Sequence, residues 1–321
     1  MRKSLALAGA LAVSALMTTA AQAEYPERPI QMIVSYSAGG GTDIAARTLV
    51  PYLEKYLGGA TISVVNRPGA GGEIGFTALA QAKPDGYTIG FINTPNLLTI
   101  PISRDTRYEM SDIEPVANVI YDPGAFSVRP DANISNLDEL IAFAKDNPGA
   151  VTYGTTGIGS DDHLAALAFE RQAGVKFEHI PFSGNADVRA AVLGGHIMMA
   201  SMNISETVPD AKEGTLVILG QMAETRWDGA ADIETFQEQG YDVIMGSDRG
   251  LGAPAGLPEE ALAKLQAAAE KAVQDPEFRA AAEKQDLALA YQDAQTFRRH
   301  IEALNASLLQ LWEDQPWIEQ D

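Results

Sequence analysis

Short apolar runs alternate with amphipathic stretches along most of this chain. Three runs of strand length lie in the first third, at residues 30–34, 61–65 and 88–92. Between them, residues 43–56 and 74–82 repeat apolar side chains with the spacing of one helix face. Strands that alternate with helices favour a parallel sheet covered by helices. The pattern therefore predicts an α/β fold.

The same alternation begins again after a longer extended run at residues 116–128, which Asp122-Pro123-Gly124 interrupts. We interpret this run as a crossing into a second domain. Beyond it the pattern predicts strands at residues 151–153, 177–181, 197–202 and 217–222, and helices at residues 137–146, 164–173, 187–193 and 234–239. Helices then continue to the end of the chain: one opens at Pro258, Asp275-Pro276 marks a break, and the last covers residues 296–311. A length of 321 residues suits about two domains.

The N-terminus has the pattern of a secretory signal peptide. Met1-Arg2-Lys3 is basic, the run to Met17 is apolar, and Ala21-Gln22-Ala23 has the small residues of a cleavage site, so we expect residues 1–23 to be removed after Ala23. The apolar run is too short for a membrane anchor. The chain has no cysteine, which excludes lipid attachment at cysteine, disulfides and thiolate metal sites. We expect a periplasmic protein that does not insert into the membrane.

The charge balance narrows the possible partners. The formal net charge is −20, so the protein as a whole repels nucleic acid and anionic lipid surfaces, and we expect no nucleic-acid partner. An anion site in such a chain has to be made locally, from backbone dipoles and a few cationic side chains.

A glycine-rich turn between the first strand and the first helix offers such a site. It runs from Ser35 to Asp43 and contains Gly39-Gly40-Gly41, followed by the hydroxyl of Thr42. A strand, a glycine turn and a helix start aim several free N–H groups at one point, and Asp43 can cap the helix. No lysine follows, so a nucleotide phosphate loop is excluded. The turn either holds an anionic ligand or only makes a tight connection.

A second turn of the same design runs from Gly154 to His163. It carries hydroxyls on Thr155, Thr156 and Ser160, and it too follows a strand and opens a helix. Ligands of open α/β sheets bind outside the carboxyl ends of the strands, where both turns lie. The alternatives are that Ser160 only caps its helix and that His163 packs against its own turn.

Other polar residues follow strands in the same way. These are Asn93, Phe182 with Ser183, and Asn203, while Arg249 lies among small, turn-forming neighbours. Phe182 either covers a ligand or fills the core. Arg249 either pairs with a ligand carboxylate or with Asp248 or another acid.

Catalytic and metal-binding patterns are weak. Ser160, Asp161, Asp162 and His163 are consecutive, whereas a nucleophile, its base and its orienting group usually converge from distant positions, and no Gly-x-Ser-x-Gly motif occurs. The four histidines lack zinc-site spacing. Asp161-Asp162 lacks a calcium-loop pattern, so we interpret the pair as solvated acids at a helix start. We expect no enzyme activity, no metal and no cofactor, with an extracytoplasmic hydrolase as the alternative.

Taken together, these motifs resemble the solute receptors of tripartite tricarboxylate transporters, the Bug or TctC family. The motifs that carry the resemblance follow in order along almost the whole mature chain: Tyr25-Pro26-Glu27-Arg28-Pro29-Ile30, Ala38-Gly39-Gly40-Gly41-Thr42-Asp43, Ala46-Arg47, Asn66-Arg67-Pro68-Gly69-Ala70-Gly71-Gly72, Pro84-Asp85-Gly86-Tyr87-Thr88, His163-Leu164, Pro181-Phe182-Ser183-Gly184, Gly194-Gly195 and Ala253-Pro254-Ala255-Gly256-Leu257-Pro258.

The resemblance implies a two-lobed periplasmic binding protein of the type II, Venus-flytrap kind, each lobe a mainly parallel sheet flanked by helices. The first lobe would hold residues 24–121 plus 245–321 and the second residues 122–244. A monomeric receptor would deliver a small carboxylate to one large and one small integral membrane subunit, or report it to a signalling partner. The residues implied or expected to contact the ligand are Ser37, Ala38, Gly39, Gly40, Thr42, Asp43, Asn93, Thr155, Thr156, Gly157, Ser160, His163, Phe182, Ser183, Asn203 and Arg249.

Three features depart from the common family pattern. The first turn reads Ser35-Tyr36-Ser37-Ala38 in place of a proline-rich version, Asp161-Asp162 replace neutral residues, and Arg249 resembles the tricarboxylate-binding branch. Two acids within several Å of the site disfavour a polyanion by about 1 kcal/mol each or more. We therefore expect a mono- or dicarboxylate, with or without an ammonium group, in preference to citrate.

Overall fold

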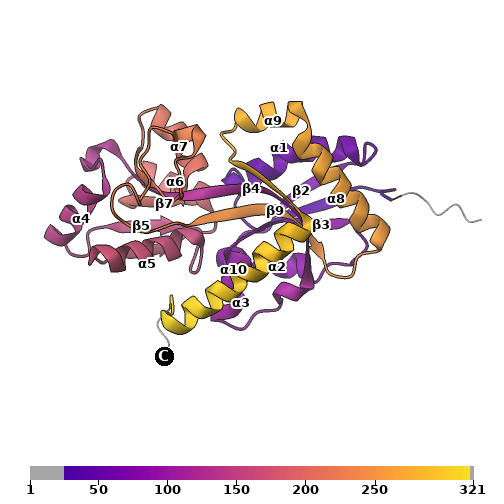
Figure 1. Cartoon of the computed structure of the whole chain (residues 1–321), viewed down its shortest axis with the longest axis horizontal. Coiled ribbons are helices and arrows are strands. Elements are labelled where there is room, and N and C mark those ends of the chain that lie inside the picture. The colour runs from indigo at the N-terminus through magenta and orange to yellow at the C-terminus, as the bar shows by residue number, and fades with distance from the viewer. Residues whose placement is uncertain (1–24, 319–321) are drawn as a thin grey trace, which may run out of the picture.

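A computed structural model describes residues 25–318 of the chain. The expected signal peptide, its cleavage site and residues 319–321 lie outside the described residues. The described chain forms two lobes, which Figure 1 shows joined by the long strands β4 and β9. None of the helices in residues 25–318 is both long and apolar enough to cross a membrane.

The first lobe is built around three parallel strands. Their order is β2-β1-β3, and the register places Ile30 opposite Ile62 and Gln31 opposite Thr88. The elements in this part are β1 (Ile30–Val34), α1 (Gly41–Tyr56), β2 (Ile62–Asn66), α2 (Glu73–Ala80), β3 (Thr88–Asn93) and α3 (Asn96–Ser103). The apolar periodicity predicts these strands and α1 to within two residues, but it does not predict α3.

Strand β4 (Ile113–Val128) belongs to both lobes. Its first part pairs antiparallel with β9 (Gly246–Pro254), and residues 124–128 pair antiparallel with β7 (Met199–Asn203) and β8 (Val217–Gln221). The strand therefore continues through Asp122-Pro123-Gly124, where the sequence pattern suggests an interruption. The missing N–H of Pro123 falls where the pairing passes from one part of the sheet to the other, a position where a strand tolerates proline.

The second lobe repeats the strand–helix alternation. Its elements are α4 (Leu137–Asp146), β5 (Thr152–Thr155), α5 (Asp161–Ala173), β6 (Glu178–Pro181), α6 (Asn185–Leu193), β7 (Met199–Asn203), α7 (Ile204–Lys212) and β8 (Val217–Gln221). Strands β6, β5 and β7 are parallel. The helix expected at residues 234–239 is absent, because Thr235 bridges to Gln221 and the backbone of Phe236 donates to the same residue, so this segment lies against the end of β8 as turns.

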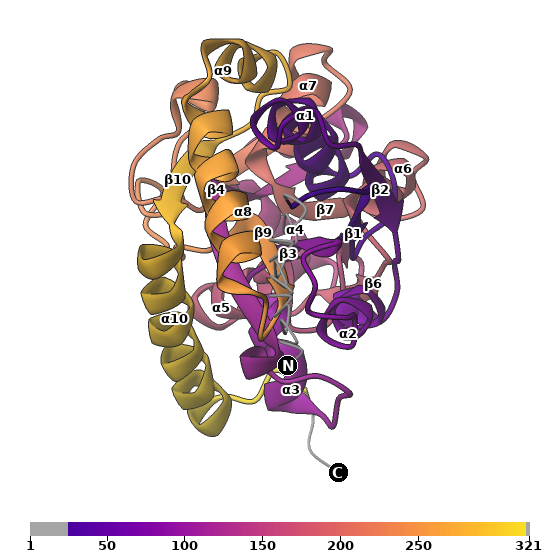
Figure 2. The ribbon, with the colours of Figure 1, turned by 90° about the vertical axis from the view of Figure 1, so that its right-hand side faces the viewer.

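The C-terminal elements return to the first lobe. They are α8 (Glu259–Gln274), α9 (Pro276–Glu283), β10 (Leu289–Asp293) and α10 (Ala294–Asp314), and Figure 2 shows α8 in front of β4 and β9 with α10 along one edge. Asp275, at the expected break, caps α9 by accepting the N–H of Glu277. The return of the chain for these helices agrees with a discontinuous first lobe, whose residue boundaries stay a prediction.

The α/β class is confirmed, but the sheet is mixed. The expectation of a mainly parallel sheet in each lobe holds only for β2-β1-β3 and β6-β5-β7, since β4 pairs antiparallel with β9, β10, β7 and β8. Adjacent parallel strands have to be joined by a crossover connection, usually a helix. Strand β9 instead returns from the second lobe to the first in the direction opposite to β4, so the two strands pair antiparallel.

Each lobe buries its own apolar core. In the first lobe, α1 and α8 pack Leu49, Leu53 and Leu265 against the sheet. In the second, Phe126, Phe169 and Phe236 stack edge to face around one centre. A third cluster packs Leu164 of the second lobe with Leu97 and Leu308 of the first, so the lobes also contact each other through apolar side chains. The core inside each lobe allows it to keep its structure when the space between the lobes changes.

Candidate functional site

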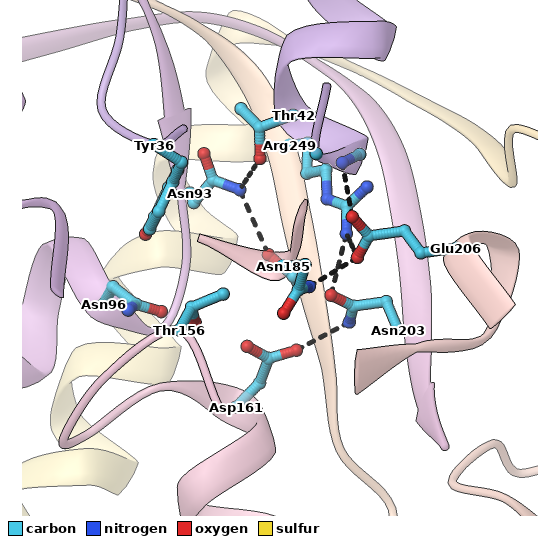
Figure 3. A pocket seen from close by; sticks show the side chains of 13 residues that line it. Tyr36, Thr42, Asn93, Asn96, Thr156, Asp161, Asn185, Asn203, Glu206 and Arg249 are labelled. Atoms are coloured by element: carbon cyan, nitrogen blue, oxygen red, sulfur yellow. Dashed lines mark hydrogen bonds and ion pairs between the residues drawn. The ribbon is translucent and has the colours of Figure 1, made fainter. Parts of the chain in front are cut away.

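A pocket lies between the lobes, beside the strands that join them (Figure 3). Its empty volume is about 300 Å³. Almost every lining side chain is polar, and both lobes contribute. Elements β1, α1, β3, α3 and β9 of the first lobe, or the turns beside them, supply Tyr36, Gly40, Gly41, Thr42, Asn93, Asn96, Ser247 and Arg249, and the second lobe supplies Thr156, Asp161, Asn185, Asn203 and Glu206.

The glycine turn brings the N-terminus of α1 to this pocket. The N-cap is Gly40, in an extended conformation, and α1 begins at Gly41. In residues 25–318, no acceptor pairs with the backbone N–H of Thr42. A helix start of this kind attracts anions through its free N–H groups and its dipole.

Asp43 holds the turn in place instead of capping the helix or facing the pocket. Its carboxylate accepts hydrogen bonds from the N–H of Gly39, from Nε of Arg47 and from Nδ2 of Asn66, each at 2.9 Å. Burial alone raises the pKa of Asp43, but these hydrogen bonds outweigh it and lower the pKa below its ordinary value. The expectation that Asp43 caps α1 is wrong because the helix begins two residues earlier, which places Asp43 in the first turn.

Arg249 is the charged centre of the pocket. Its side chain is 2% exposed. Nη1 lies 3.2 Å from Oδ2 of Asp122, and Nη2 donates to Oδ1 of Asn203 at 2.7 Å and to Oε2 of Glu206 at 3.1 Å. Asp248, the neighbour suggested by sequence, bonds instead to Thr94, Asn118 and His300. Burial alone lowers the pKa of Arg249, but the carboxylates of Glu206 and Asp122 raise it overall, so the guanidinium stays charged.

Glu206 reaches across the cleft from the first turn of α7. Its Oε1 accepts the backbone N–H of Gly41, and its Oε2 accepts hydrogen bonds from Asn185 and Arg249. A carboxylate of the second lobe therefore sits at the N-terminus of α1 in the first lobe. This shows that the turn, together with Arg249, has the geometry to hold a carboxylate.

The remaining polar groups form two short networks. Asn93 donates to Oγ1 of Thr42 at 2.8 Å, next to Ser247. Asn203 donates to Oδ2 of Asp161 at 2.7 Å, and it also donates to the carbonyl of Asp122. Each network crosses between elements that are distant in sequence, so it fixes the pocket walls relative to one another.

Asp161 and Asp162 are buried, with exposed fractions of 3% and 1%. The interpretation of this pair as solvated acids is therefore wrong, because α5 begins under the cleft and not at the surface. Burial raises the pKa of Asp161 to about 6. The pKa of Asp162 is raised well above its ordinary value, first by burial and then by the charge of Asp161. Neither oxygen of Asp162 has a hydrogen-bond partner in residues 25–318.

Most of the second turn is occupied by its own contacts. Oγ1 of Thr155 accepts the N–H of Gly157 at 3.1 Å and lies 2.7 Å from Nε2 of His179. Ser160 caps α5 by accepting the N–H of His163 at 3.1 Å. Among the candidates in this turn, only Thr156 lines the pocket.

His163 packs against its own turn, as the alternative interpretation expects. Its Nδ1 accepts the N–H of Gly159 at 3.2 Å, and its ring stacks on His179 with the centroids 4.2 Å apart. Burial lowers the pKa of His163 to about 3, so the ring is neutral. Because Ser160 bonds the backbone of His163 and not its ring, the two do not form a nucleophile and base pair.

Five other candidates lie at the edge of the cleft. Ser37 donates to Oδ2 of Asp187 across the lobes at 2.6 Å, and Ala38 and Gly39 are exposed at the tip of the turn. Ser183 is exposed, and Phe182 packs beside the second-lobe cluster of Val188, Val192 and Ile197. None of these five side chains lines the pocket.

The structure brings six of the expected residues together and adds others that the sequence did not single out as contacts. Those that line the pocket are Gly40, Thr42, Asn93, Thr156, Asn203 and Arg249, and the additions are Tyr36, Gly41, Asn96, Asp161, Asn185, Glu206 and Ser247. Asn185 and Glu206 directly follow the ends of β6 and β7, so the rule that finds Asn203 also finds them if it is extended into the next helix turn. Within residues 25–318, no group of three or more His, Asp or Glu residues could hold a metal ion.

Comparisons with known proteins show similarity to receptors and periplasmic binding proteins. The family model described as "Tripartite tricarboxylate transporter family receptor" matches residues 45–310. A UPF0065 protein of Cupriavidus necator is 33% identical over 293 residues, which cover 91% of this chain and 89% of the relative. The solved structure of the periplasmic binding protein BugD superposes with a TM-score of 0.87 at 28% identity and covers 92% of this chain and 100% of its own. MatC of Rhodopseudomonas palustris, solved with bound malate, gives a TM-score of 0.82 at 26% identity and covers 90% of this chain and 99% of its own.

Proposed function

This chain belongs to the tripartite tricarboxylate transporter receptor family of periplasmic solute-binding proteins, and from this premise we propose that it captures a small organic carboxylate between its lobes and delivers it to a membrane transporter. Members of this family are binding proteins, and the neutral His163 with its self-bonded turn offers no catalytic pair.

The observation that carries the proposal is the position of the Glu206 carboxylate. It accepts the N–H of Gly41 and lies 3.1 Å from Nη2 of Arg249. A ligand carboxylate that takes the place of the Glu206 carboxylate, or that accepts the adjacent N–H of Thr42, meets both the dipole of α1 and the buried guanidinium of Arg249. These are strong contacts for a carboxylate because the site is shielded from water.

The similar structure of MatC supports the ligand class, since that protein was solved with malate. We propose that the ligand of this chain is of similar size, with one carboxylate at the start of α1.

Delivery requires that the loaded and empty receptors differ in shape. In this chain, contacts such as Ser37 with Asp187, and Oγ1 of Thr99 with the carbonyl of Gly159 at 2.7 Å, link the lobes in the closed arrangement. A bound ligand would strengthen this arrangement, and the membrane partner, one large and one small integral subunit, would read it. We place the receptor in the periplasm as a monomer, after cleavage at Ala23.

The test is isothermal titration of the mature, ligand-stripped protein against a panel of mono-, di- and tricarboxylates and amino acids. Binding of at least one compound, accompanied by compaction in small-angle X-ray scattering, supports the proposal. If a folded and stripped protein binds none of these compounds, the proposed function is wrong.

A further inference from the structure

The walls of the cleft carry more negative than positive charge. Asp122, Asp161 and the largely buried Glu206 surround the buried guanidinium of Arg249, and beside them lies Asp162, whose raised pKa keeps it protonated. The electrostatic neighbours of Asp162 include Asp161, Glu206 and Asp122 as well as Arg249, so these groups form one cluster. A ligand that brings only negative charge would add to the repulsion among the ionised acids Asp122, Asp161 and Glu206.

An unpaired hydrogen-bond acceptor in the pocket is an observation independent of charge. Oδ1 of Asn185 is buried and has no hydrogen-bond partner in the described part of the chain. The Nδ2 group of Asn185 must be the atom that faces Glu206, because a carboxylate only accepts hydrogen bonds. The leftover atom is therefore an acceptor. It lines the pocket, and the side chain is 6% exposed.

Asn93 repeats this arrangement on the opposite wall. Its Nδ2 donates to Thr42, and its Oδ1 is buried without a partner within residues 25–318. Figure 3 shows Asn93 and Asn185 projecting into the same space, with Asp161 below them. An unpaired acceptor in a buried place needs a donor, and the Asn185 acceptor, which lies beside the carboxylates of Glu206 and Asp161, calls for a group with several N–H bonds.

The donors and acceptors are separated within the pocket. The free N–H of Thr42 and the guanidinium of Arg249 suit a carboxylate, whereas the unpaired amide oxygen of Asn185 and the negatively charged carboxylates of Asp161 and Glu206 suit a cationic donor. We propose that the ligand is an amino-carboxylate, with its carboxylate at the start of α1 and its ammonium group between Asn185, Asp161 and Glu206. This inference rests on the proposed function and names the chemical class of its ligand.

Glu206 has a defined part in this selection. An ammonium group that approaches Asn185 neutralises the nearby acids and leaves Arg249 free to bind the ligand carboxylate. A plain dicarboxylate has to compete with Glu206 for both Gly41 and Arg249 and gains nothing from Asn185 or Asn93. Sites built to hydrogen-bond an N–H group reject analogues that lack it.

The test compares matched ligands that differ only in the amino group. L-aspartate is titrated against succinate, and L-glutamate against glutarate, using the mature, ligand-stripped protein. We expect the better amino acid to bind at least about tenfold tighter than its deaminated partner, because the unpaired acceptors remain unsatisfied with the latter. Equal or tighter binding of succinate and glutarate would overturn the inference while leaving the carboxylate receptor intact. Binding of other carboxylates in the panel but of no amino acid would overturn it as well, whereas only the failure of the whole panel would count against the proposed function itself.

Substitutions of Glu206 and Asn185 test whether these residues cause the preference for a ligand with an amino group. Glu206→Gln removes the charge at the same size, so the preference for the amino acid should fall about tenfold. Glu213→Gln, on an exposed residue at the end of the same helix, is the matched control and should keep the wild-type ratio. Asn185→Ala is a second variant in case Glu206→Gln does not fold, and it too should lower the ratio. An unchanged ratio in a folded Glu206→Gln or Asn185→Ala protein would contradict the assignment.

Discussion

The backbone N–H of Gly41 donates a hydrogen bond to Oε1 of Glu206, so the first residue of α1 is joined to the first turn of α7 across the cleft. One lobe thus supplies a helix N-terminus and the other supplies the carboxylate that meets it. This contact depends on the absence of a side chain at position 41, because a Cβ there would collide with Nη1 of Arg249 and with the carboxylate of Glu206.

Gly41→Ala should abolish ligand binding. The added methyl group would displace Arg249 and Glu206, and overpacking of this kind forces neighbouring groups to shift, so we expect a loss of roughly 100-fold or more in affinity. Ala38→Ser is the matched control, because it adds one atom at an exposed residue of the same turn that does not line the pocket. Titration calorimetry on both variants checks this, and equal affinities would contradict the position of the site.

Arg249→Lys should fold but bind its carboxylate more weakly. Arg249 contacts Asp122, Asn203 and Glu206 at once through the fork of its guanidinium, which a single ammonium group cannot reproduce. We expect about a 10- to 100-fold loss of affinity. The same titrations measure it, and unfolding in urea confirms that the variant is folded. Wild-type affinity in the lysine variant would show that the guanidinium does not contact the ligand.

Ser160→Ala should lower stability and leave binding unchanged. The Ser160 hydroxyl accepts the N–H of His163 as the N-cap of α5 and does not line the pocket. Loss of such a cap costs about 1 kcal/mol. Urea unfolding and calorimetry measure the two effects separately. A large drop in affinity at unchanged stability would return Ser160 to the ligand contacts expected from sequence.

Asp162→Asn should stabilise the protein at neutral pH and have little effect in acid. Burial raises the pKa of Asp162 in the folded state, so the folded protein holds a proton that the unfolded chain releases. The free energy of unfolding of the wild type therefore falls as pH rises above about 4, the ordinary pKa of an aspartate. The amide mimics the protonated acid, and we expect a gain of about 1 to 3 kcal/mol at pH 7.5.

This gain should shrink steadily toward pH 4.5, as measured by urea unfolding of both proteins at several pH values. Glu213→Gln, at an exposed position, is a suitable comparison because it should show no such trend. A difference between Asp162→Asn and the wild type that stays constant with pH would mean that Asp162 is ionised in the folded protein.

Local pattern was sufficient for much of the fold. The apolar run at Ile30–Val34 and the spacing that follows predict β1 and α1, and Asp275-Pro276 predicts the break that separates α8 from α9. Hydrophobic periodicity and helix-capping residues depend only on neighbouring positions, so both can be recognised from the sequence alone. The helix expected at residues 234–239 fails for the complementary reason, since pairing of that backbone with Gln221 outweighs local propensity.

The sequence by itself determined the class of fold and the anion-attracting turn at Gly40, because strand and helix periods and glycine turns act over a few residues. Only the tertiary structure decided that Glu206 would face this turn, that Asn185 would be left with a free acceptor, and that Asp161 and Asp162 would be buried. These facts depend on the antiparallel return of β9 along β4, which brings Arg249 between the lobes. The electrostatic selectivity of the cleft arises from groups that are far apart in the chain. Their closeness in space follows from the fold and cannot be recognised from local sequence patterns.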